Sequence, residues 1–390
     1  MTPRIQFDGR PVWAEISLGA IGHNFRLVRR NIGRKRKILA VVKANAYGLG
    51  AVPVSKALSR MGADAFGVTC SQEGIELREA GIREPILLLT GSWPGEEEII
   101  LKYDLTPVVA RLDQLGYLER AAAKRRGKNA RKKIPFHLKI DSGMNRLGIS
   151  RGEVAVLARA YADCPHLEMK GTLTHFASSE DFRTQQNEEQ ERVFAAALAD
   201  LRAAGVSPGI VHEANSGAIC GRPATWADMV RPGAVLYGYH QGFEPAEAAA
   251  EIRRKFPLKP CLSLRSRIIS LRKIAAGESV GYSARFVAER PSRIAVIAAG
   301  YADGIVRQRS NRGCVIVRSK LVPLVGAISM DLSMIDVTDV ENAAVGDVVT
   351  IYGKDGEASV EVDQAARQIG TVTSDLLCAL GRRVPRFYLA

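Results

Sequence analysis

Short apolar runs alternate with longer polar or alanine-rich segments over the first two-thirds of the chain. Eight runs look like strands, and the segments between them have room for a helix and two loops. We expect the strands at ILAVVK to Lys43, AFGV to Val68, ILLLT to Thr90, TPVV to Val109, FHLKI to Ile140, GTLTH to His175, IVHE to Glu213 and VLYG to Gly238. Their spacing of about 28 residues predicts an α/β fold, a (β/α)8 barrel. A doubly wound sheet is disfavoured because no GxGxxG follows the first strand.

The pattern changes after Tyr239. A polar connector that contains proline, QGFEPAEAAAEIRRKFPLK, precedes closely spaced apolar runs separated by glycine-bearing breaks. Those runs are LSLRSRIIS, RIAVIAA, CVIV, LVPLVGAI, SMIDV and DVVTIYG, and helices are expected near 363–369 and 374–382. We therefore predict two domains, a barrel over 1–245 and a mostly antiparallel β domain over 246–390. The first residues of the chain are expected to pack on the β domain.

Charge is the unusual feature of the composition. The chain has 55 basic and 41 acidic residues, a net charge of +14 and a pI near 9.6, which raises nucleic acid as a partner. Fifteen of the basic residues and one acidic residue lie in two runs, 23–37 and 119–133, and the remainder of the chain has 40 of each sign. Neither run interleaves aromatic residues with its charges, so nucleic acid is not favoured. Both runs precede a predicted strand, at the amino-terminal rim of the barrel.

The amino terminus lacks the apolar core of a secretory signal, and no uncharged apolar stretch is long enough to cross a membrane. The six cysteines are scattered, without CxxC or zinc-ligand spacing, so no metal site is expected. Reduced, scattered cysteines are typical of a cytoplasmic protein, which is the location that we expect.

Polar residues gather at the predicted strand ends, where a barrel carries its chemistry. Lys43 closes the first strand, Lys139 and Asp141 the fifth, and His175 the sixth. Four further positions lie in the neighbouring loops, namely Arg146, Asn215, Ser216 and Arg231. Two small-residue segments, Ser216-Gly217 and Gly233-Ala234, offer backbone N–H groups to a phosphate. Each of these residues has an ordinary structural interpretation alone, but together they indicate one site.

These residues lie in a series of blocks that resembles the pyridoxal-phosphate-dependent alanine racemases over almost the whole chain. The blocks are AVVKANAYGLG, HLKIDSGMNRLGI, GTLTHFAS, HEANSGA, DMVRPGAVLYG, GESVGYSARF, AGYADG, VGAISMDLSMIDVTD and RRVPRFYL. The resemblance implies an enzyme that interconverts L- and D-alanine, with a small amino acid as substrate. It also implies a homodimer in which the β domain of one subunit covers the barrel mouth of the other. Supply of D-alanine for peptidoglycan is implied in the same way.

The resemblance further assigns roles by position. Lys43 holds pyridoxal phosphate covalently and is one catalytic base, and Tyr282 is the other. The remaining cofactor contacts fall to Tyr47, His175, Asn215, Ser216, Arg231, Gly233 and Ala234, with Arg231 facing the pyridine nitrogen beside His175. Arg146 and Met330 contact the substrate. Lys139 by itself is expected to pair with an acid, and the resemblance offers a second interpretation, a carbamylated lysine whose new negative charge stabilises Arg146. Asp303 and Asp331 are interpreted as turn-formers.

Three positions depart from the family. Ser374 replaces a tyrosine at the site entrance, Leu49 a histidine and Ala327 an arginine. The lost phenol predicts a roomier pocket, so a racemase that prefers serine or a broader set of amino acids stays open. An amino-acid decarboxylase of the same barrel fold also stays open, although its catalytic cysteine cannot be placed. A non-catalytic cofactor carrier is less favoured, because the β domain bearing Tyr282 argues against it.

Overall fold

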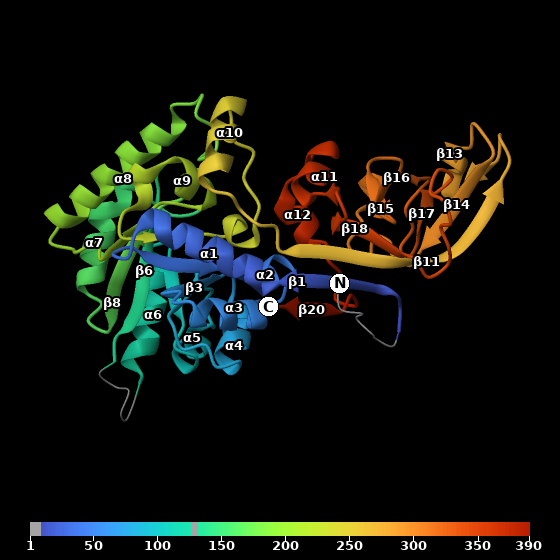
Figure 1. Ribbon diagram of the computed structural model, residues 1–390. Helices are drawn as coiled ribbons and strands as arrows, with labels where there is room; N and C mark the ends of the chain where they lie inside the picture. The colour runs from blue at the N-terminus through green and yellow to red at the C-terminus, as the bar shows by residue number, and fades with distance from the viewer. Residues whose placement is uncertain (1–8, 126–131) are drawn as a thin grey trace. The chain divides into compact units, whose positions relative to one another are not determined.

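The computed structural model describes residues 9–125 and 132–390, and it divides into two compact units. The barrel unit contains residues 20–46 and 51–259, and the β unit contains the residues up to Gly19, residues 47–50 and residues 260–390. Figure 1 colours the barrel unit mainly from blue to yellow and the β unit mainly from orange to red. The part of the second basic run that spans 126–131 lies outside the described residues.

Eight parallel strands form the barrel. They are hydrogen-bonded in the order β10-β2-β3-β4-β5-β6-β8-β9. Their bounds are β2 (Lys37–Val41), β3 (Ala65–Val68), β4 (Ile86–Leu88), β5 (Thr106–Val109), β6 (Ile134–Asp141), β8 (Leu167–Leu173), β9 (Ile210–His212) and β10 (Met229–Val230). The backbone N–H groups of Asp228 and Arg231 donate to the carbonyls of Val211 and Ala214, and these bonds bring β9 and β10 together. The predicted barrel is confirmed.

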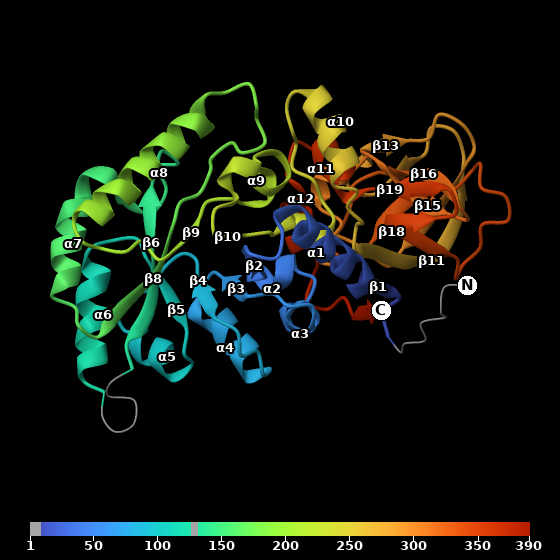
Figure 2. The same ribbon diagram turned by 60° about the vertical axis from the view of Figure 1, so that its left-hand side comes forward.

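Helices separate the strands, as the spacing of the apolar runs predicts. They are α1 (Leu18–Ile32), α2 (Lys43–Tyr47), α3 (Ala51–Arg60), α4 (Ser71–Glu79), α5 (Glu97–Lys102), α6 (Asp113–Ala123), α7 (Val154–Ala162), α8 (Gln186–Ala203), α9 (Ser216–Gly221) and α10 (Ala246–Lys255). The short strand β7 (Ile149–Ser150) pairs with β6. Figure 2 shows α4 to α8 outside the strands. All four residues of β3 are buried because helices cover the outside of a parallel barrel and side chains fill its inside.

The prediction for the eighth strand is wrong. Val235 to Tyr237 lie in a 3-10 helix, Ala234–Tyr237, rather than a strand. Gly238 closes this turn with a φ of 91°, a left-handed conformation that favours glycine. The strand is β10, six residues earlier, and its two residues are too few to give a periodic signal. Arg231 therefore follows the eighth strand directly instead of leading into it.

The β unit is built on a nine-stranded sheet with the order β19-β18-β15-β16-β17-β14-β11-β1-β20. Its strands are β1 (Val12–Ser17), β11 (Leu262–Ile274), β14 (Ser292–Ile297), β15 (Cys314–Val317), β16 (Lys320–Val325), β17 (Ser333–Asp336), β18 (Val348–Asp355), β19 (Ala358–Val360) and β20 (Arg386–Leu389). All neighbours are antiparallel except β1 and β20, and β18 also pairs with β11. A hairpin of β12 (Ser279–Val280) and β13 (Phe286–Val287) and the helices α11 (Val362–Gln368) and α12 (Thr373–Cys378) complete it.

Alternating burial explains why these segments are strands. The first seven residues of β11 alternate between buried and half-buried side chains, the pattern of a strand with one face on a core. The six apolar runs expected after the connector all contain strands, and the expected helix at 363–369 corresponds to α11. The second expected helix is shorter than predicted, because α12 ends at Cys378 rather than Arg382.

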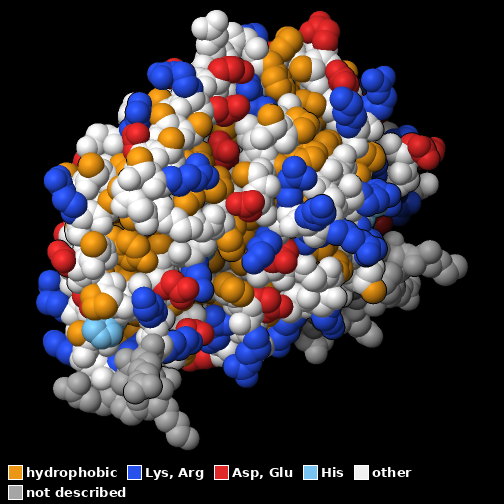
Figure 3. Space-filling model, turned by 90° about the vertical axis from the view of Figure 1, so that its left-hand side faces the viewer, with side chains coloured by type: hydrophobic (Ala, Val, Ile, Leu, Met, Phe, Trp, Pro, Cys, Tyr) orange, Lys and Arg blue, Asp and Glu red, His pale blue; other side chains and the backbone are white. Residues whose placement is uncertain are grey.

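Three described basic residues of the two runs make local contacts. Arg29 pairs with Asp64 at 2.8 Å, Lys132 pairs with Asp104 at 2.6 Å, and the Arg36 guanidinium lies 5.6 Å from the centre of the Trp226 ring. Figure 3 shows Lys and Arg side chains mixed with Asp and Glu on the face that it presents. The charge on that face is thus interspersed, unlike the continuous basic stripe typical of a nucleic-acid surface.

Candidate active site

Lys43 stands two residues beyond the end of β2, at the start of a left-handed turn. Ala44, Asn45, Ala46 and Tyr47 all have φ between 52° and 58°. This conformation costs a residue with a Cβ roughly 1–2 kcal/mol, and such strain is concentrated at functional sites. The Asn45 Oδ1 atom accepts from the Ala51 N–H at 2.7 Å, which helps to hold the turn. The Lys43 side chain is exposed in the single chain.

Glu73 also supports this turn from the next strand-to-helix segment. Its two carboxylate oxygens accept from the backbone N–H groups of Ala44, at 2.5 Å, and Thr69, at 2.7 Å. One carboxylate thereby ties the segment after β2 to the segment after β3. The backbone immediately after Lys43 is therefore held by the Glu73 carboxylate and the Asn45 amide.

Lys139 lies on β6 and is buried, with 7% of its surface exposed. Burial lowers the pKa of its amino group to about 8, and the neighbouring cations Arg231, Arg146 and Lys43 act in the same direction. Only Asp141 opposes them. A substantial fraction of this lysine is therefore neutral near pH 8, which is the form that reacts with carbon dioxide.

Asp141, at the end of β6, shapes the loop that carries Arg146. Its Oδ1 atom accepts from the N–H groups of Gly143, Met144 and Asn145 at 3.0, 3.0 and 3.1 Å. Asn145, which precedes Arg146, adopts a φ of 55°. The Asp141 carboxylate is thus hydrogen-bonded to the loop backbone, and these bonds fix the point from which Arg146 extends.

Arg231 is 3% exposed and extends along the ends of β8 and β9. Its Nη1 atom donates to the His212 carbonyl at 2.7 Å, and its Nη2 atom donates to those of Thr174 and Glu213 at 2.7 and 2.9 Å. Burial lowers its pKa to about 10, and Glu213 opposes this effect. The guanidinium still carries its charge at neutral pH, and the carbonyl dipoles hold it in one orientation.

Three histidines form a chain with Arg231. His175 Nδ1 lies 3.2 Å from Nη2, His212 Nδ1 lies 3.3 Å from Nη1, and His212 Nε2 lies 2.8 Å from His137 Nδ1. Because a guanidinium only donates, both Nδ1 atoms facing it accept, and His175 and His212 carry their protons on Nε2. His212 therefore donates to His137. Burial is the main cause that lowers the pKa of all three rings, to about 4 for His137, so they are neutral.

The loops after β9 and β10 meet at Ser216 and Gly233. The Gly233 N–H donates to Ser216 Oγ at 2.9 Å. Asn215 caps α9, because its Oδ1 atom accepts from Ala218 N at 3.0 Å and from Ser179 Oγ at 2.8 Å. A Cβ on Gly217 would overlap Ser179 Oγ, so the segment has no room for a side chain there. Small residues and a buried hydroxyl form a close-fitting turn beside Ala234.

The cations at this end of the barrel outnumber the available carboxylates. Besides burial, positive charge lowers the pKa of Lys139, from Arg231, Arg146 and Lys43, and the same three residues together with Lys139 lower the pKa of His175. Asp141 is already bonded to three amides. Glu213 is only partly ionised near neutral pH, because burial raises its pKa to about 7. An anionic molecule is therefore favoured here. A phosphate on the small-residue turn and a phenolate between the cations, the two anionic groups of pyridoxal phosphate, fit this arrangement.

The structure thus brings together most of the predicted residues, on the barrel unit. They are Lys43, Lys139, Arg146, His175, Asn215, Ser216, Arg231, Gly233 and Ala234. His175 lies two residues beyond β8 rather than at its end. His137 and His212 were not predicted. The available signal was the two-residue period of β6, which places His137 on the same face as Lys139.

The other three predicted residues lie on the β unit. Tyr47 ends the left-handed turn, and burial, with a smaller contribution from Cys378, raises the pKa of its phenol to about 12. Tyr282 begins a short turn after β12 and is 70% exposed, while Met330 follows β16 and is 52% exposed. Large exposed apolar side chains of this kind are typical of interaction surfaces when they lie near one another.

Sequence comparisons identify the family. The profile described as "Alanine racemase, N-terminal domain" matches residues 16–241, and "Alanine racemase, C-terminal domain" matches residues 261–388. The chain belongs to the alanine racemase family. It is 41% identical to the alanine racemase of Geobacter sulfurreducens over 387 residues, which cover 98% of each chain. It is 38% identical to that of Methanococcus maripaludis over 97% of this chain and 99% of the other.

Solved alanine racemases share the fold. The Bacillus anthracis enzyme with bound L-Ala-P aligns with a TM-score of 0.89 and 31% identity, over 99% of this chain and 96% of that one. The Bartonella henselae enzyme with covalently bound pyridoxal phosphate aligns with a TM-score of 0.86 and 31% identity, over 98% of this chain and 100% of the other. The predicted family, enzyme class and cofactor are confirmed. A decarboxylase and a cofactor carrier are not favoured.

No helix among residues 9–125 and 132–390 combines the length and apolar character needed to cross a bilayer. Within the same residues, no three His, Cys, Asp or Glu side chains form a group suited to a metal ion.

Proposed function

We propose that this racemase interconverts L- and D-alanine with pyridoxal phosphate bound at the carboxyl ends of its barrel strands, using Lys43 and Tyr282 as its two bases. The observation that carries the proposal is the excess of cations around Lys139 and Arg231, to which a doubly anionic cofactor is complementary. Family membership gives the reaction, and the excess of cations indicates where on the barrel the cofactor binds.

Lys43 holds the cofactor covalently, and Tyr47, Ser216, Gly233 and Ala234 bind its phosphate. Asn215 contributes by keeping Ser216 in place through the cap of α9. Arg231, with His175 beside it, faces the ring nitrogen. Its fixed charge disfavours a proton on that nitrogen.

The bound cofactor spreads the negative charge that remains when the α-proton of alanine leaves. The protein must then supply a base on each face of the amino acid. The amino group of Lys43 removes and returns the proton of the D-enantiomer, and the phenol oxygen of Tyr282 serves the L-enantiomer. Arg146 and Met330 hold the substrate between them.

His175 stabilises the Tyr282 base by a hydrogen bond. Arg231 occupies its Nδ1 atom, so its Nε2–H is left to donate to the phenolate oxygen of Tyr282. A neutral histidine pinned by a permanent cation stabilises a phenolate without itself giving up a proton. His212 and His137 extend the chain inward and keep Arg231 from turning.

We also propose that the active unit is a homodimer, with Tyr282 and Met330 contributed to the partner's barrel. The 70% and 52% exposure of these side chains supports the proposal, because a catalytic phenol needs a partner surface to exclude water. Mixing inactive Lys43→Ala and Tyr282→Phe proteins tests it. If sites are shared, random exchange of subunits should restore about a quarter of the wild-type activity, since one intact site forms in each mixed dimer. No recovery would mean that each site is built from one chain.

The activity itself is tested by loss of optical rotation from L-alanine, measured with the cofactor-loaded protein. Loss of optical rotation without release of carbon dioxide or an amine supports racemisation. In heavy water, Tyr282→Phe should still incorporate deuterium into D-alanine while losing racemisation, because Lys43 still serves that face. Gas release without racemisation would instead indicate a decarboxylase.

Lys139 is proposed to carry a carbamate. Its burial and lowered pKa favour the neutral amine that adds carbon dioxide, and the product would exchange one cation for an anion beside Arg146. Dependence of activity on bicarbonate in wild type, but not in Lys139→Gln, tests this role. A cytoplasmic location is also proposed, supported by six free cysteines.

A further inference from the structure

A short loop after β16, residues Ser329 to Asp331, carries the substrate-contacting Met330 of the proposed site. Two reciprocal bonds close it, from Ser329 N to the Leu332 carbonyl and from Leu332 N to Ser329 Oγ, each at 3.0 Å. The Met330 side chain points into solvent from this loop. The loop must therefore be held from behind if Met330 is to have a fixed place.

The backbone after β14 provides one support. Tyr301 N and Ala302 N donate to the carbonyls of Ser329 and Met330, each at 3.0 Å. The approach is so close that a Cβ on Gly300 would overlap both of those carbonyls. Glycine is required here by contact with the loop rather than by its own φ.

Asp303 lies behind both segments, and its side chain is fully buried. Its Oδ2 atom accepts from the Gly300 N–H at 3.0 Å. Arg383 meets it with two parallel contacts, Nε to Oδ1 at 2.7 Å and Nη2 to Oδ2 at 3.0 Å, and Arg10 approaches Oδ2 at 3.3 Å. A buried carboxylate needs such partners, so this pair alone would explain a structural role.

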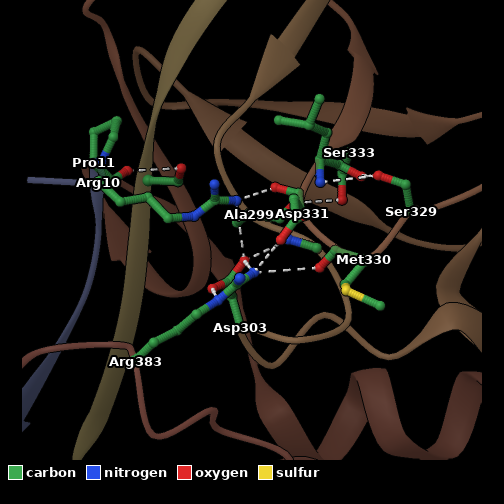
Figure 4. Close-up of polar contacts among 12 residues, drawn as sticks. Arg10, Pro11, Ala299, Asp303, Ser329, Met330, Asp331, Ser333 and Arg383 are labelled. Carbon is green, nitrogen blue, oxygen red and sulfur yellow. Dashed lines mark hydrogen bonds and ion pairs between the residues drawn. The ribbon is translucent and has the colours of Figure 1, made fainter.

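Arg383 has a second acceptor that a structural role does not require. Its Nη2 atom also lies 2.6 Å from Asp331 Oδ1 and 3.5 Å from the Met330 carbonyl, as Figure 4 shows. Arg10 donates to the Asp331 carbonyl from the opposite side. The Asp331 side chain is 48% exposed, and an ion pair so exposed adds little to stability. The contact between Arg383 and Asp331 instead restrains the loop.

We propose that Arg383 is a positioning residue for racemisation, which bridges buried Asp303 and loop residue Asp331 and so holds Met330 at the substrate. The inference rests on the proposed function, because it takes Met330 as a substrate contact. The bridge depends on the planar guanidinium, which reaches two carboxylates at once, whereas a lysine offers one nitrogen.

The test compares Arg383→Lys with Asp331→Ala and Asp331→Asn in the cofactor-loaded enzyme. Arg383→Lys and Asp331→Ala should each raise the KM for alanine about tenfold with a much smaller change in kcat, because each loses a charged hydrogen bond to the loop. Asp331→Asn retains an acceptor oxygen and should restore most of the affinity. Arg382→Lys, the same change at the exposed neighbouring position, is the matched control.

Two further readouts separate positioning from stability. The double variant Arg383→Lys/Asp331→Ala should have the KM of a single variant, since both changes break one link. Hydrogen exchange of the amides at 301–302 and 332 should accelerate in Arg383→Lys, while the melting temperature of Asp331→Ala stays near that of wild type. A KM that does not rise in either single variant, or additive effects, would overturn the inference.

The exchange measurement does not require catalysis. A wild-type protein that binds the cofactor but racemises nothing would refute the proposed function. Unchanged exchange in Arg383→Lys, in a protein that does racemise alanine, would refute the loop restraint alone. The two failures are therefore distinguishable.

Discussion

The Nη2 atom of Arg231 lies 3.2 Å from Nδ1 of His175, and this contact sets which nitrogen of the ring carries the proton. The same guanidinium faces His212 and three backbone carbonyls. One side chain therefore organises the ends of β8 and β9 and also orients a proposed catalytic histidine. The backbone contacts and the orientation of His175 therefore depend on the same two terminal nitrogens of Arg231.

Arg231→Lys should lower both stability and activity. A lysine keeps the charge but does not reach all three carbonyls, and unfilled buried acceptors should cost about 2–4 kcal/mol. Urea unfolding and racemisation rate measure the two effects. Arg151→Lys, at an exposed pair with Asp200, is the control and should change little. Equal losses of unfolding free energy and of racemisation rate in the two variants would contradict the role assigned to Arg231.

The protein should lose stability as the pH falls from about 6.5 toward 4. The folded pKa of His137 is lowered to about 4 by burial and by Arg231, so the unfolded chain binds a proton first and is favoured by acid. The contribution is fully present above pH ~6.5 and amounts to about 3 kcal/mol once lost. Unfolding free energies at several pH values should show a flatter dependence in His137→Asn. If the unfolding free energy of His137→Asn depends on pH as steeply as that of wild type, His137 is not the source of the pH dependence.

Ser374→Tyr should lower the ratio of serine to alanine turnover. Ser374 is half-buried at the start of α12, where the family resemblance leads us to expect a phenol that fills space. Extra room changes discrimination by only ~1–3 kcal/mol, so alanine should remain a substrate of wild type. The measurement is kcat/KM for both amino acids. Ser374→Ala, which adds no bulk, should leave the ratio nearly unchanged, and a ratio unaffected by tyrosine would rule out this position as the determinant.

Gly217→Ala should weaken binding of pyridoxal phosphate about tenfold. The new methyl group overlaps Ser179 Oγ, and the collision displaces a segment capped by Asn215. Equilibrium titration of the cofactor measures the loss. Ser179→Gly in the same protein relieves the overlap and should recover part of the affinity. If the double variant binds no better than Gly217→Ala, the overlap is not the cause.

The barrel was predictable because its strands are continuous apolar runs at a regular spacing. The strand β10 was missed since two residues carry no period, and the apolar run VLYG, enclosed by Gly233 and Gly238, forms a 3-10 turn instead. The left-handed conformation after Lys43 was also not predictable, because alanine and asparagine in KANAY are equally compatible with a right-handed turn.

The grouping of the candidate residues was predictable where they lie at strand ends, as for Lys43 after β2 and Lys139 on β6. Asp303 does close its turn by accepting from the Gly300 N–H, but its contacts with two distant arginines were not predicted. Its partner Arg383 is 80 positions away, and nothing in the local sequence distinguishes a carboxylate buried under two arginines from one that only caps a turn. Contacts of this kind depend on tertiary packing, which the period of a strand does not encode.

The place of β1 has a consequence for synthesis. Val12–Ser17 is synthesised well before both of its sheet partners, β11, which begins at Leu262, and β20, which ends at Leu389. At ribosomal speeds of roughly 5–20 residues per second, about 250 residues of chain separate β1 from β11 by tens of seconds. All eight barrel strands are synthesised in this interval. A chain truncated by even its last few residues would therefore leave β1 with an open edge, ready to recruit the wrong neighbour.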